Sequence, residues 1–423
     1  MKVLVVGSGG REHAIVLSLK KSKRVNKIYC APGNAGIALD ADCIDIQAMD
    51  FERLVSFVKE NSIDFTIIGM DDPLVSGIVD VFEKEGLKIF GPRKNAAIIE
   101  GSKSFSKNLM KKYNIPTAKY EVFESYDNAL NYLDNQNFPI VIKADGLALG
   151  KGVVICTTKE EAQKELKDIM LNSKFGIAGK KVVIEEFLEG QEVSILSFCD
   201  GKTVIPMVSA QDHKKALDGD KGLNTGGMGT FSPSTFYTDK IANDCMNNIF
   251  KPTIEAMNKE GRSFVGILYF GLILTKEGMK VIEYNARFGD PETQVILPRL
   301  KTDIIDIMEA CVDGRLKDIN IEWYDNAAVC VILASGGYPL EYEKGFEIKG
   351  LDKLSDNDSI IVYHAGTSFK DGKFLTNGGR VLGITGIGKN INEAINITYE
   401  AVKVVDFNKK HFRKDIGRKD YNI

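Results

Sequence analysis

The segment Val281-Ile-Glu-Tyr-Asn-Ala-Arg-Phe-Gly-Asp-Pro-Glu-Thr-Gln294 groups several side chains that could carry out chemistry. Glu283 and Asn285 are two residues apart, so on a strand their side chains point to the same face. A carboxylate and an amide oxygen together suit Mg²⁺ or Mn²⁺, which take oxygen ligands from protein and from nucleotide phosphates. Arg287 continues this period and could meet negative charge on a transferring phosphoryl group. Taken alone, the segment is equally consistent with a surface strand and a turn at Gly289-Asp290-Pro291.

A second candidate region joins two strand-like runs through a glycine-rich loop. Phe138-Pro-Ile-Val-Ile-Lys143 leads into Ala144-Asp-Gly-Leu-Ala-Leu-Gly-Lys-Gly152, and Val153-Val-Ile-Cys156 follows. A P-loop needs Gly-Lys-Ser/Thr at the start of a helix, whereas this loop runs into β-branched residues. A hairpin with a lysine at each end, Lys143 and Lys151, can fold over nucleotide phosphates as the glycine loop of a kinase does. The sequence therefore predicts a phosphate clamp rather than a P-loop.

The elements that position these groups begin with an N-terminal βαβ series. Four strand-like runs alternate with amphipathic stretches: 3–6, 27–30, 65–68 and 87–90. This alternation predicts a parallel, doubly wound sheet with ligand-binding loops at the carboxyl ends of its strands. The first loop, Gly7-Ser-Gly-Gly-Arg-Glu-His13, has Glu12 where a dinucleotide fingerprint has its third glycine, so NAD is not expected. Its backbone N–H groups and Arg11 favour a phosphate, although a purely structural turn has the same pattern.

The middle of the chain supplies further candidate binding segments. After a helical pattern at 95–112, Val182-Val-Ile-Glu-Glu-Phe-Leu188 reads as a strand whose edge could hold an adenine ring, with Glu192 for ribose hydroxyls. Ser209-Ala-Gln-Asp-His-Lys214 and Leu223-Asn-Thr-Gly-Gly-Met-Gly229 are polar loops, and the glycines of the second allow close backbone approach to a ligand. These segments predict a small-molecule site rather than a structural surface.

The last section of the chain predicts a third domain, and the overall composition limits the possible partners and location. Strand-like runs after residue 326 are followed by an amphipathic helix at 392–405, an α+β pattern. The predicted domains are 1–100 (βαβ), 101–325 (with a lobe at about 121–191) and 326–423 (α+β). With 423 residues, a net charge of −3 and no long apolar run, we expect neither nucleic acid nor a membrane as partner. Seven scattered cysteines indicate reduced thiols and a cytoplasmic protein, and four separated histidines give little support for zinc or a catalytic triad.

The order of these motifs resembles the ATP-grasp superfamily, and the whole chain resembles the phosphoribosylamine–glycine ligase family. The segments that carry the narrower resemblance are Gly7–His13, Gln211-Asp-His-Lys214, Asn224-Thr-Gly-Gly-Met-Gly229, Arg287-Phe-Gly-Asp-Pro-Glu292, Ala334-Ser-Gly-Gly-Tyr-Pro339 and Phe412-Arg-Lys-Asp-Ile-Gly417. The resemblance implies two α+β lobes that clamp ATP with Mg²⁺ or Mn²⁺. It also implies the ligation of glycine to 5-phosphoribosylamine through glycyl phosphate in de novo purine biosynthesis, by a monomer.

The resemblance also implies a role for each matched residue. Glu283 and Asn285 are the metal ligands, and the phosphate ligands are Lys103, Lys143, Gly150, Lys151 and Gly152. Adenine and ribose are held by Glu185, Glu186, Glu192 and the backbone of Phe187 and Leu188. Arg287 stabilises the transferring phosphoryl group, and Asp212 and Asp290 face glycine and the amine. The substrate-binding residues are Gly9, Gly10, Arg11, Glu12, Asp71, Asp212, Asn224, Thr225, Gly226, Asp290 and Pro291.

The sequence departs from the family pattern at one place, and two alternative functions remain to be distinguished. Gly69-Met-Asp-Asp-Pro-Leu74 stands where the family has Gly-Pro-Glu-x-Pro-Leu, so Asp71 carries the charge one methylene shorter. The nearer alternative is another ATP-grasp carboxylate–amine ligase or a carboxylase, which the N-terminal sheet alone does not exclude. The other is a nucleotide-sensing protein without catalysis, which would be expected to lack the metal ligands Glu283 and Asn285 or the arginine Arg287.

Overall fold

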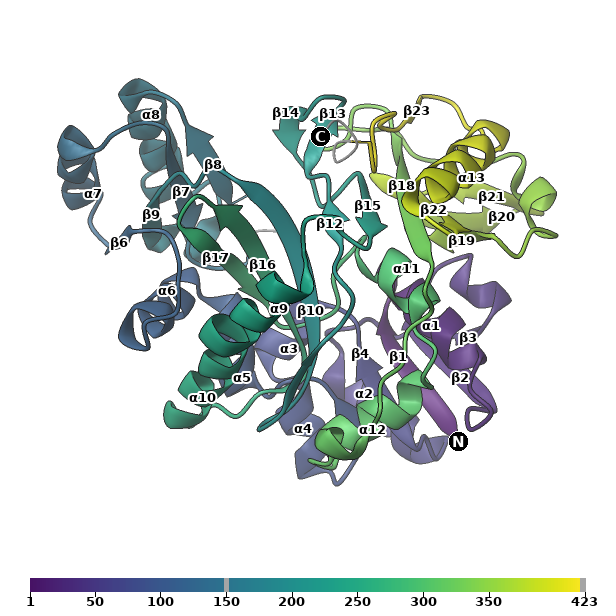
Figure 1. Cartoon of the computed structure of the whole chain (residues 1–423). Helices are drawn as coiled ribbons and strands as arrows, with labels where there is room; N and C mark the ends of the chain where they lie inside the picture. The colour runs from purple at the N-terminus through teal and green to yellow at the C-terminus, as the bar shows by residue number, and fades with distance from the viewer. Residues whose placement is uncertain (148–151, 419–423) are drawn as a thin grey trace.

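The computed structural model describes residues 1–147 and 152–418, and its N-terminal part is a parallel sheet at the lower right of Figure 1. Its strands are β1 (Lys2–Gly7), β2 (Lys27–Pro32), β3 (Asp42–Cys43), β4 (Phe65–Ile68) and β5 (Ile89–Phe90). They lie in the order β3-β2-β1-β4-β5, and each neighbouring pair is parallel. The predicted parallel sheet is confirmed, with β3 as an additional strand that is too short and polar to show a pattern. The strand order reverses between β2-β1 and β4, which places the loops after β1 and β4 at the ligand-binding edge.

The helices of this part of the chain follow the expected alternation. They are α1 (Gly10–Lys20), α2 (Phe51–Glu60), α3 (Asp71–Ser76) and α4 (Ile78–Lys84). The single helical pattern expected at 95–112 is instead two helices, α5 (Lys94–Gly101) and α6 (Lys103–Lys112). Gly101 ends the first helix, and the Ser102 hydroxyl caps the second by accepting from the Phe105 N–H at 3.1 Å. The break makes Lys103 the first residue of α6.

Two antiparallel sheets follow. One forms the lobe at the upper left of Figure 1, with the order β6 (Tyr120–Phe123), β9 (Val182–Glu186), β7 (Ile140–Ala144), β8 (Val153–Cys156). Helices α7 (Tyr126–Tyr132) and α8 (Lys159–Met170) cover it. The other sheet has the order β11 (Val204–Pro206), β10 (Gln191–Asp200), β16 (Val265–Thr275), β17 (Gly278–Asn285). Strands β16 and β17 form a hairpin that leads into the segment around Glu283.

Strand β16 is buried on both faces, which explains its continuous apolar sequence. Leu268 and Phe270 belong to one core, which includes α10 (Lys251–Lys259) and the preceding α9 (Asp239–Cys245). Ile267 and Tyr269 point the other way, into a core shared with α12 (Ile304–Val312) and the N-terminal sheet. The same core includes apolar side chains of the C-terminal part, so the three predicted domains share buried surface.

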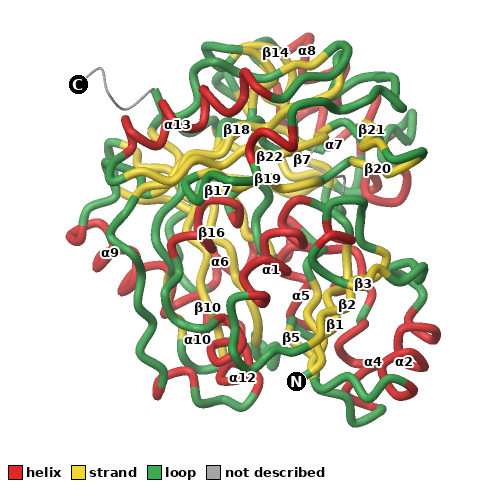
Figure 2. The backbone as a smooth tube through the Cα atoms, turned by 90° about the vertical axis from the view of Figure 1, so that its right-hand side faces the viewer, coloured by secondary structure: helices red, strands yellow, loops and turns green. Residues whose placement is uncertain are grey.

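The C-terminal sheet recruits strands from the middle of the chain. Its order is β12 (Gln211–Asp212), β15 (Gly229–Ser232), β18 (Ala327–Ser335), β22 (Arg380–Gly388), β19 (Ile360–His364), and β23 (Lys410–His411) pairs with β18. Figure 2 shows α13 (Ile391–Val404) beside β18 and β22, on which it packs. The remaining elements are the hairpins β13 (Lys215–Leu217)–β14 (Lys221–Asn224) and β20 (Thr367–Lys370)–β21 (Lys373–Thr376), and the short helix α11 (Thr293–Ile296). The sheet therefore crosses the predicted boundary at 325/326, and the predicted domain limits stay predictions.

Among residues 1–147 and 152–418, no helix is both long enough and apolar enough to cross a membrane.

Candidate active site

The loop after β1 is built around the buried carboxylate of Glu12. Glu12 accepts hydrogen bonds from the Gly9 N–H and, at 2.9 Å, from Arg11 Nε. Its side chain fills the space where a Cβ at Gly7, Gly9 or Gly69 would lie. The Glu12 side chain therefore packs between the loop after β1 and the loop after β4. In a dinucleotide-binding site this sequence position is a glycine, which has no side chain to fill that space. Burial, opposed in part by Arg11, raises the pKa of the Glu12 carboxyl.

Asp290 and an arginine from the C-terminal sheet join three loops at one point. The Arg380 guanidinium lies 3.1 Å from the Asp290 carboxylate and donates to the carbonyls of Asp290 and Gly226, each at 2.7 Å. Burial opposes ionisation of Asp290, but Arg380 and Arg11 lower the pKa of its carboxyl. A Cβ at Gly10 would meet the side-chain amide of Gln294, which donates to Asp290 at 2.7 Å. The predicted substrate residues Gly9, Gly10, Gly226 and Asp290 are thus brought together.

Arg287 lies in a carboxylate-rich setting between the N-terminal part and β17. Its guanidinium is 3.0 Å from Glu100 and 3.9 Å from Asp71, and it donates to the Asn285 side-chain oxygen at 3.3 Å. Burial opposes ionisation of Asp71, but Arg287 and Arg11 lower the pKa of the Asp71 carboxyl. The Asp71 side chain therefore faces Arg287 across the site, despite its departure from the family pattern.

Glu283 is surrounded by ammonium groups. Lys214 Nζ lies 3.6 Å from the Glu283 carboxylate. Burial opposes ionisation, but the charges of Lys214, Lys143 and Lys103 lower the pKa of the Glu283 carboxyl to about 2. Glu283 and Asn285 lie on β17 with the buried Tyr284 between them, so their side chains share the half-exposed face as predicted.

The lysines predicted to hold phosphates come from two different elements. Lys103, at the start of α6, donates from Nζ to the Gly146 carbonyl at 2.9 Å. Lys143, at the end of β7, is buried and lies 3.0 Å from Glu185 while donating to the Ile282 carbonyl at 3.2 Å. Burial lowers the pKa of the Lys103 ammonium, and nearby Glu283 opposes this shift. Gly150 and Lys151 lie outside the described residues, and Gly152 is buried immediately before β8.

The segment predicted to hold adenine and ribose leaves β9 at Glu186. Glu186 accepts from the Lys119 N–H at 2.9 Å, whereas Glu185 is buried and faces lysines. Phe187 is exposed and Leu188 half-buried. Glu192 is exposed, and its carboxylate lies 3.8 Å from Lys214.

Asp212 is one of the residues that line a small pocket beside β10, β16 and β17. The lining residues are Glu192, Val193, Ser194, Asp212, Lys214, Tyr269, Gly271, Leu272 and Ile282. Burial, reinforced by Glu292, raises the pKa of the Asp212 carboxyl well above its usual range. Pro291 is close to the same aspartate, because a Cβ at Gly227, which has a φ of +115°, would collide with both side chains. The Thr225 hydroxyl donates to the Lys214 carbonyl at 2.9 Å and accepts from the Gly227 N–H, while Asn224 ends β14.

Several residues at this site were not singled out by sequence reasoning. Arg380 and Lys107 occur within patterns that read as an ordinary strand and an ordinary helix. Glu292 ends the quoted Arg287–Glu292 motif but was given no role of its own. Glu292 accepts from the hydroxyls of Ser194 and Tyr269, each at 3.1 Å, in a buried cluster behind Asp212. No local signal distinguishes such residues, because their partners lie far away in the sequence.

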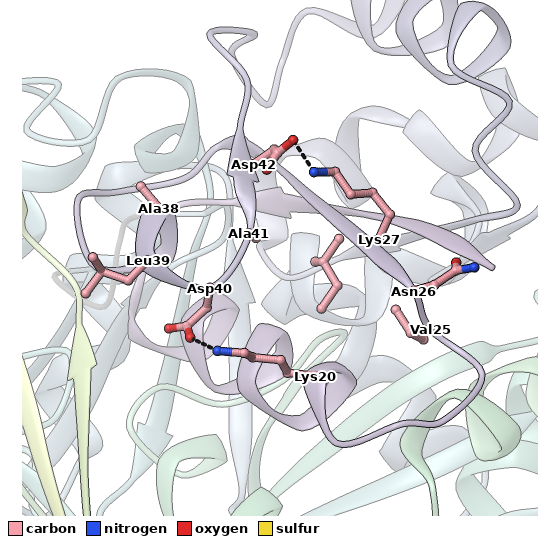
Figure 3. A pocket seen from close by; sticks show the side chains of 10 residues that line it. Lys20, Val25, Asn26, Lys27, Ala38, Leu39, Asp40, Ala41 and Asp42 are labelled. Carbon is pink, nitrogen blue, oxygen red and sulfur yellow. Dashed lines mark hydrogen bonds and ion pairs between the residues drawn. The ribbon is translucent and has the colours of Figure 1, made fainter. Parts of the chain in front are cut away.

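A different pocket lies on the N-terminal part of the chain, as Figure 3 shows. It is open and is bordered by the ion pairs Lys20–Asp40 and Lys27–Asp42. None of the predicted catalytic or binding residues lines it. The candidate active site is therefore the region where the loops after β1 and β4, strand β17 and the lysines of α6 and β7 come together.

Each part of this chain also matches known proteins. Residues 1–100, 101–293 and 328–419 match, respectively, the N domain, the ATP-grasp (A) domain and the C domain of phosphoribosylglycinamide synthetase. The chain is 54% identical over 418 residues to a phosphoribosylamine–glycine ligase of Caldanaerobacter subterraneus subsp. tengcongensis, with 99% of each chain covered. It is 52% identical over 419 residues to that of Halalkalibacterium halodurans, covering 99% of this chain and 97% of the relative.

Solved structures extend the comparison to three dimensions. The phosphoribosylamine–glycine ligase of Thermotoga maritima has a TM-score of 0.86 at 35% identity, covering 98% of this chain and 100% of that one. A biotin carboxylase domain of Hydrogenobacter thermophilus 2-oxoglutarate carboxylase, solved with MgADP and bicarbonate, has a TM-score of 0.74 at 16% identity, covering 97% and 91%. The second likeness concerns the fold alone. The three matched domains and the full-length relatives show that this chain belongs to the phosphoribosylglycinamide synthetase family.

Proposed function

We propose that this chain joins glycine to 5-phosphoribosylamine with ATP, giving glycinamide ribonucleotide, ADP and phosphate in purine biosynthesis. Glycine carboxylate attacks the γ-phosphoryl group and releases ADP. The amine of phosphoribosylamine then attacks the carbonyl of glycyl phosphate, forming the amide, losing a proton and releasing phosphate. The observation that carries the proposal is the ring of cations, Lys103, Lys143, Lys214 and Arg287, around the ionised carboxylate of Glu283. Phosphoryl transfer needs such positioning and charge neutralisation more than a protein nucleophile.

The residues present fit a divalent cation bound together with nucleotide phosphates. Glu283 is held ionised and offers oxygens beside the Asn285 side-chain oxygen. Within the described residues no cluster of three or more His, Cys, Asp or Glu side chains could hold a metal. The fit is therefore to Mg²⁺ or Mn²⁺, which complete their coordination with phosphate oxygens and water. Bound there, the cation would neutralise charge on the phosphates, and Glu283 and Asn285 would hold it.

Arg287 is placed to receive an additional anion. Its Nε atom is buried and has no hydrogen-bond partner among the described residues, although its terminal nitrogens contact Glu100, Asn285 and the Phe288 carbonyl. A buried donor without a partner is costly, so a ligand oxygen there would be stabilising. This supports the role of Arg287 at the glycine carboxylate or the transferring phosphoryl group.

The phosphoribosyl end fits the loop after β1. Gly9 and Gly10 begin α1, where backbone N–H groups favour a phosphate, and Arg11 lies beside them. Glu12 shapes this loop through Gly9 and Arg11. Asp290 lies beside Gly9 and Gly10, and Asp212 lies close to the neighbouring Pro291. We assign these two carboxyl groups to the glycine and the attacking amine, where a carboxylate can accept the proton that the amine loses.

The alternatives make different predictions. The biotin carboxylase domains with TM-scores above 0.7 share the fold at 16% identity or less, whereas the full-length ligases are 54% and 52% identical to this chain, which favours the ligase. The two loops predicted to hold substrate, at Gly226 and Asp290, also meet at Arg380. A sensor without catalysis would not need an ionised Glu283 beside Asn285 and Arg287. We keep the prediction that the protein is a monomer. The seven cysteines are free thiols, which supports the predicted cytoplasmic location.

The test is phosphate release from Mg-ATP with glycine, with and without phosphoribosylamine generated in situ. We expect release to need both substrates and to match the appearance of glycinamide ribonucleotide. Phosphate release with bicarbonate in place of glycine would support the carboxylase. No turnover with either, from folded protein that binds ATP, would contradict the ligase proposal.

A further inference from the structure

Lys107 is a fully buried lysine that the reaction described above does not use. Its side chain projects from α6 and has about 2% of its surface exposed. Nζ lies 2.9 Å from Glu185 and donates to the Thr117 hydroxyl at 2.7 Å. Thr117 in turn donates to the Val281 carbonyl on β17, the strand that carries the predicted metal ligands. Lys107 is therefore packed against the site while its own side chain is closed off from solvent.

The carboxylate of Glu185 is shared by two lysines. Lys107 approaches it from α6, and Lys143 approaches both of its oxygens at 3.0 Å from β7. Two ammonium groups and one carboxylate leave one net positive charge in a buried cluster. With Lys107 removed, Glu185 and Lys143 would neutralise each other, and a buried carboxylate would hold its single partner strongly.

We propose that Lys107 is a positioning residue for ATP: it satisfies the charge of Glu185 so that the charge of Lys143 is available to the nucleotide phosphates. The inference rests on the proposed use of Lys143 as a phosphate ligand. On this proposal Lys107 affects only the binding of the phosphates, and it does so through Glu185 and Lys143. Lys107 itself does not contact adenine, glycine or phosphoribosylamine.

The burial and charge of Lys107 favour this role over simple packing. An apolar side chain such as Leu or Met would fill this position of α6 at no cost in desolvation, whereas burial lowers the pKa of the Lys107 ammonium to about 8. Glu185 and Glu283 oppose that shift, and Lys143 reinforces it. The chain thus keeps a charge where burial opposes it, next to the predicted phosphate site.

The experiment measures nucleotide binding without turnover, so it does not depend on the ligase reaction. ATP, ADP and adenosine are titrated into the purified full-length chain by calorimetry or by competition. The variants are Lys107→Met, Glu185→Gln, the double variant, and Lys111→Met as an exposed control on the same helix. Formation of glycinamide ribonucleotide by the wild type is assayed separately, which tests the proposed function.

For Lys107→Met we expect the Kd for ATP and ADP to rise about tenfold, equivalent to ~1.4 kcal/mol, with the Kd for adenosine changed less than about twofold. In the Glu185→Gln background, adding Lys107→Met should leave ATP affinity unchanged, because the carboxylate through which Lys107 acts is then absent. This comparison does not depend on what Glu185→Gln itself does to the binding of adenine. Unchanged ATP affinity in Lys107→Met, or an equal loss for adenosine, would overturn the proposal. If Lys107→Met does not fold, the double variant is compared with Glu185→Gln alone. Equal ATP affinity supports the indirect role, and weaker binding by the double variant contradicts it.

Discussion

The Arg380 guanidinium, which comes from strand β22, lies 3.1 Å from the carboxylate of Asp290 on the loop after β17. The same side chain donates to the carbonyls of Asp290 and Gly226. One arginine of the C-terminal sheet thereby sets the position of two loops that sequence reasoning assigned to substrates. The geometry of both loops therefore depends on a residue that we do not expect to touch ATP.

Replacing Arg380 with methionine should therefore impair the substrate side of the reaction selectively. We expect the KM for glycine and for phosphoribosylamine to rise about tenfold, with the Kd for ATP changed less than about twofold. Steady-state kinetics with each substrate varied, and calorimetry for ATP, give these values. Arg315→Met, an exposed arginine paired with Asp313, is the control. Equal losses for ATP and glycine would mean that Arg380 only stabilises the fold.

Glu283→Gln should abolish turnover while the chain stays folded. The amide keeps the shape of the side chain but loses the charge that the surrounding lysines hold ionised. We expect kcat to fall at least about a hundredfold and the Mg²⁺ or Mn²⁺ requirement for nucleotide binding to disappear. Metal titrations at fixed ATP measure the second effect. Glu277→Gln, in the turn of the same hairpin, should match the wild type, and near-normal activity of Glu283→Gln would rule out the metal assignment.

Arg11→Ala should raise the KM for phosphoribosylamine about tenfold or more, with little change in the KM for ATP. Arg11 holds the loop after β1 through Glu12 and donates to the Phe288 carbonyl at 3.2 Å, and both contacts lie on the phosphoribosyl side. Initial rates with each substrate varied separate the two constants. Lys23→Ala, an exposed residue just after α1, is the control. If both KM values rose by the same factor, the division into two subsites would be wrong.

Stability should decline in mild acid because of a buried histidine between the N-terminal and C-terminal parts. Burial, with His13 adding to it, lowers the pKa of His364 to about 3 from its ordinary 6.5. Below about pH 6.5 the unfolded chain binds more protons than the folded chain, so the free energy of unfolding falls as the pH drops, until about pH 3. The effect is at most ~1.4 kcal/mol per pH unit.

Thermal unfolding at about pH 7 and about pH 5 measures this effect. His364→Gln should lower Tm at neutral pH, because the His364 ring contacts Phe374 and hydrogen-bonds Thr367, but it should reduce the loss of Tm on acidification. His411→Gln is the matched histidine replacement. An unchanged acid sensitivity in His364→Gln would assign the decline to other groups.

Local patterns predicted much of the architecture from the sequence. The alternation of strands and helices in the first ninety residues indicated the parallel sheet, and period-two spacing placed Glu283 and Asn285 on one face. The helix expected at 95–112 was divided in two, since Gly101 and the capping Ser102 outweigh an otherwise continuous helical pattern.

The sequence by itself determined the family, the types of element and which side chains could do chemistry, because these depend on neighbouring residues and on motifs of fixed spacing. The tertiary structure alone decided that Arg380 meets Asp290, that Lys107 and Lys143 share Glu185, and that β12 and β15 join the C-terminal sheet. Each of these contacts joins residues distant in the chain. Whether such charges pair depends on how the packed elements bring them together and exclude water. Local sequence periodicity contains no information about that packing.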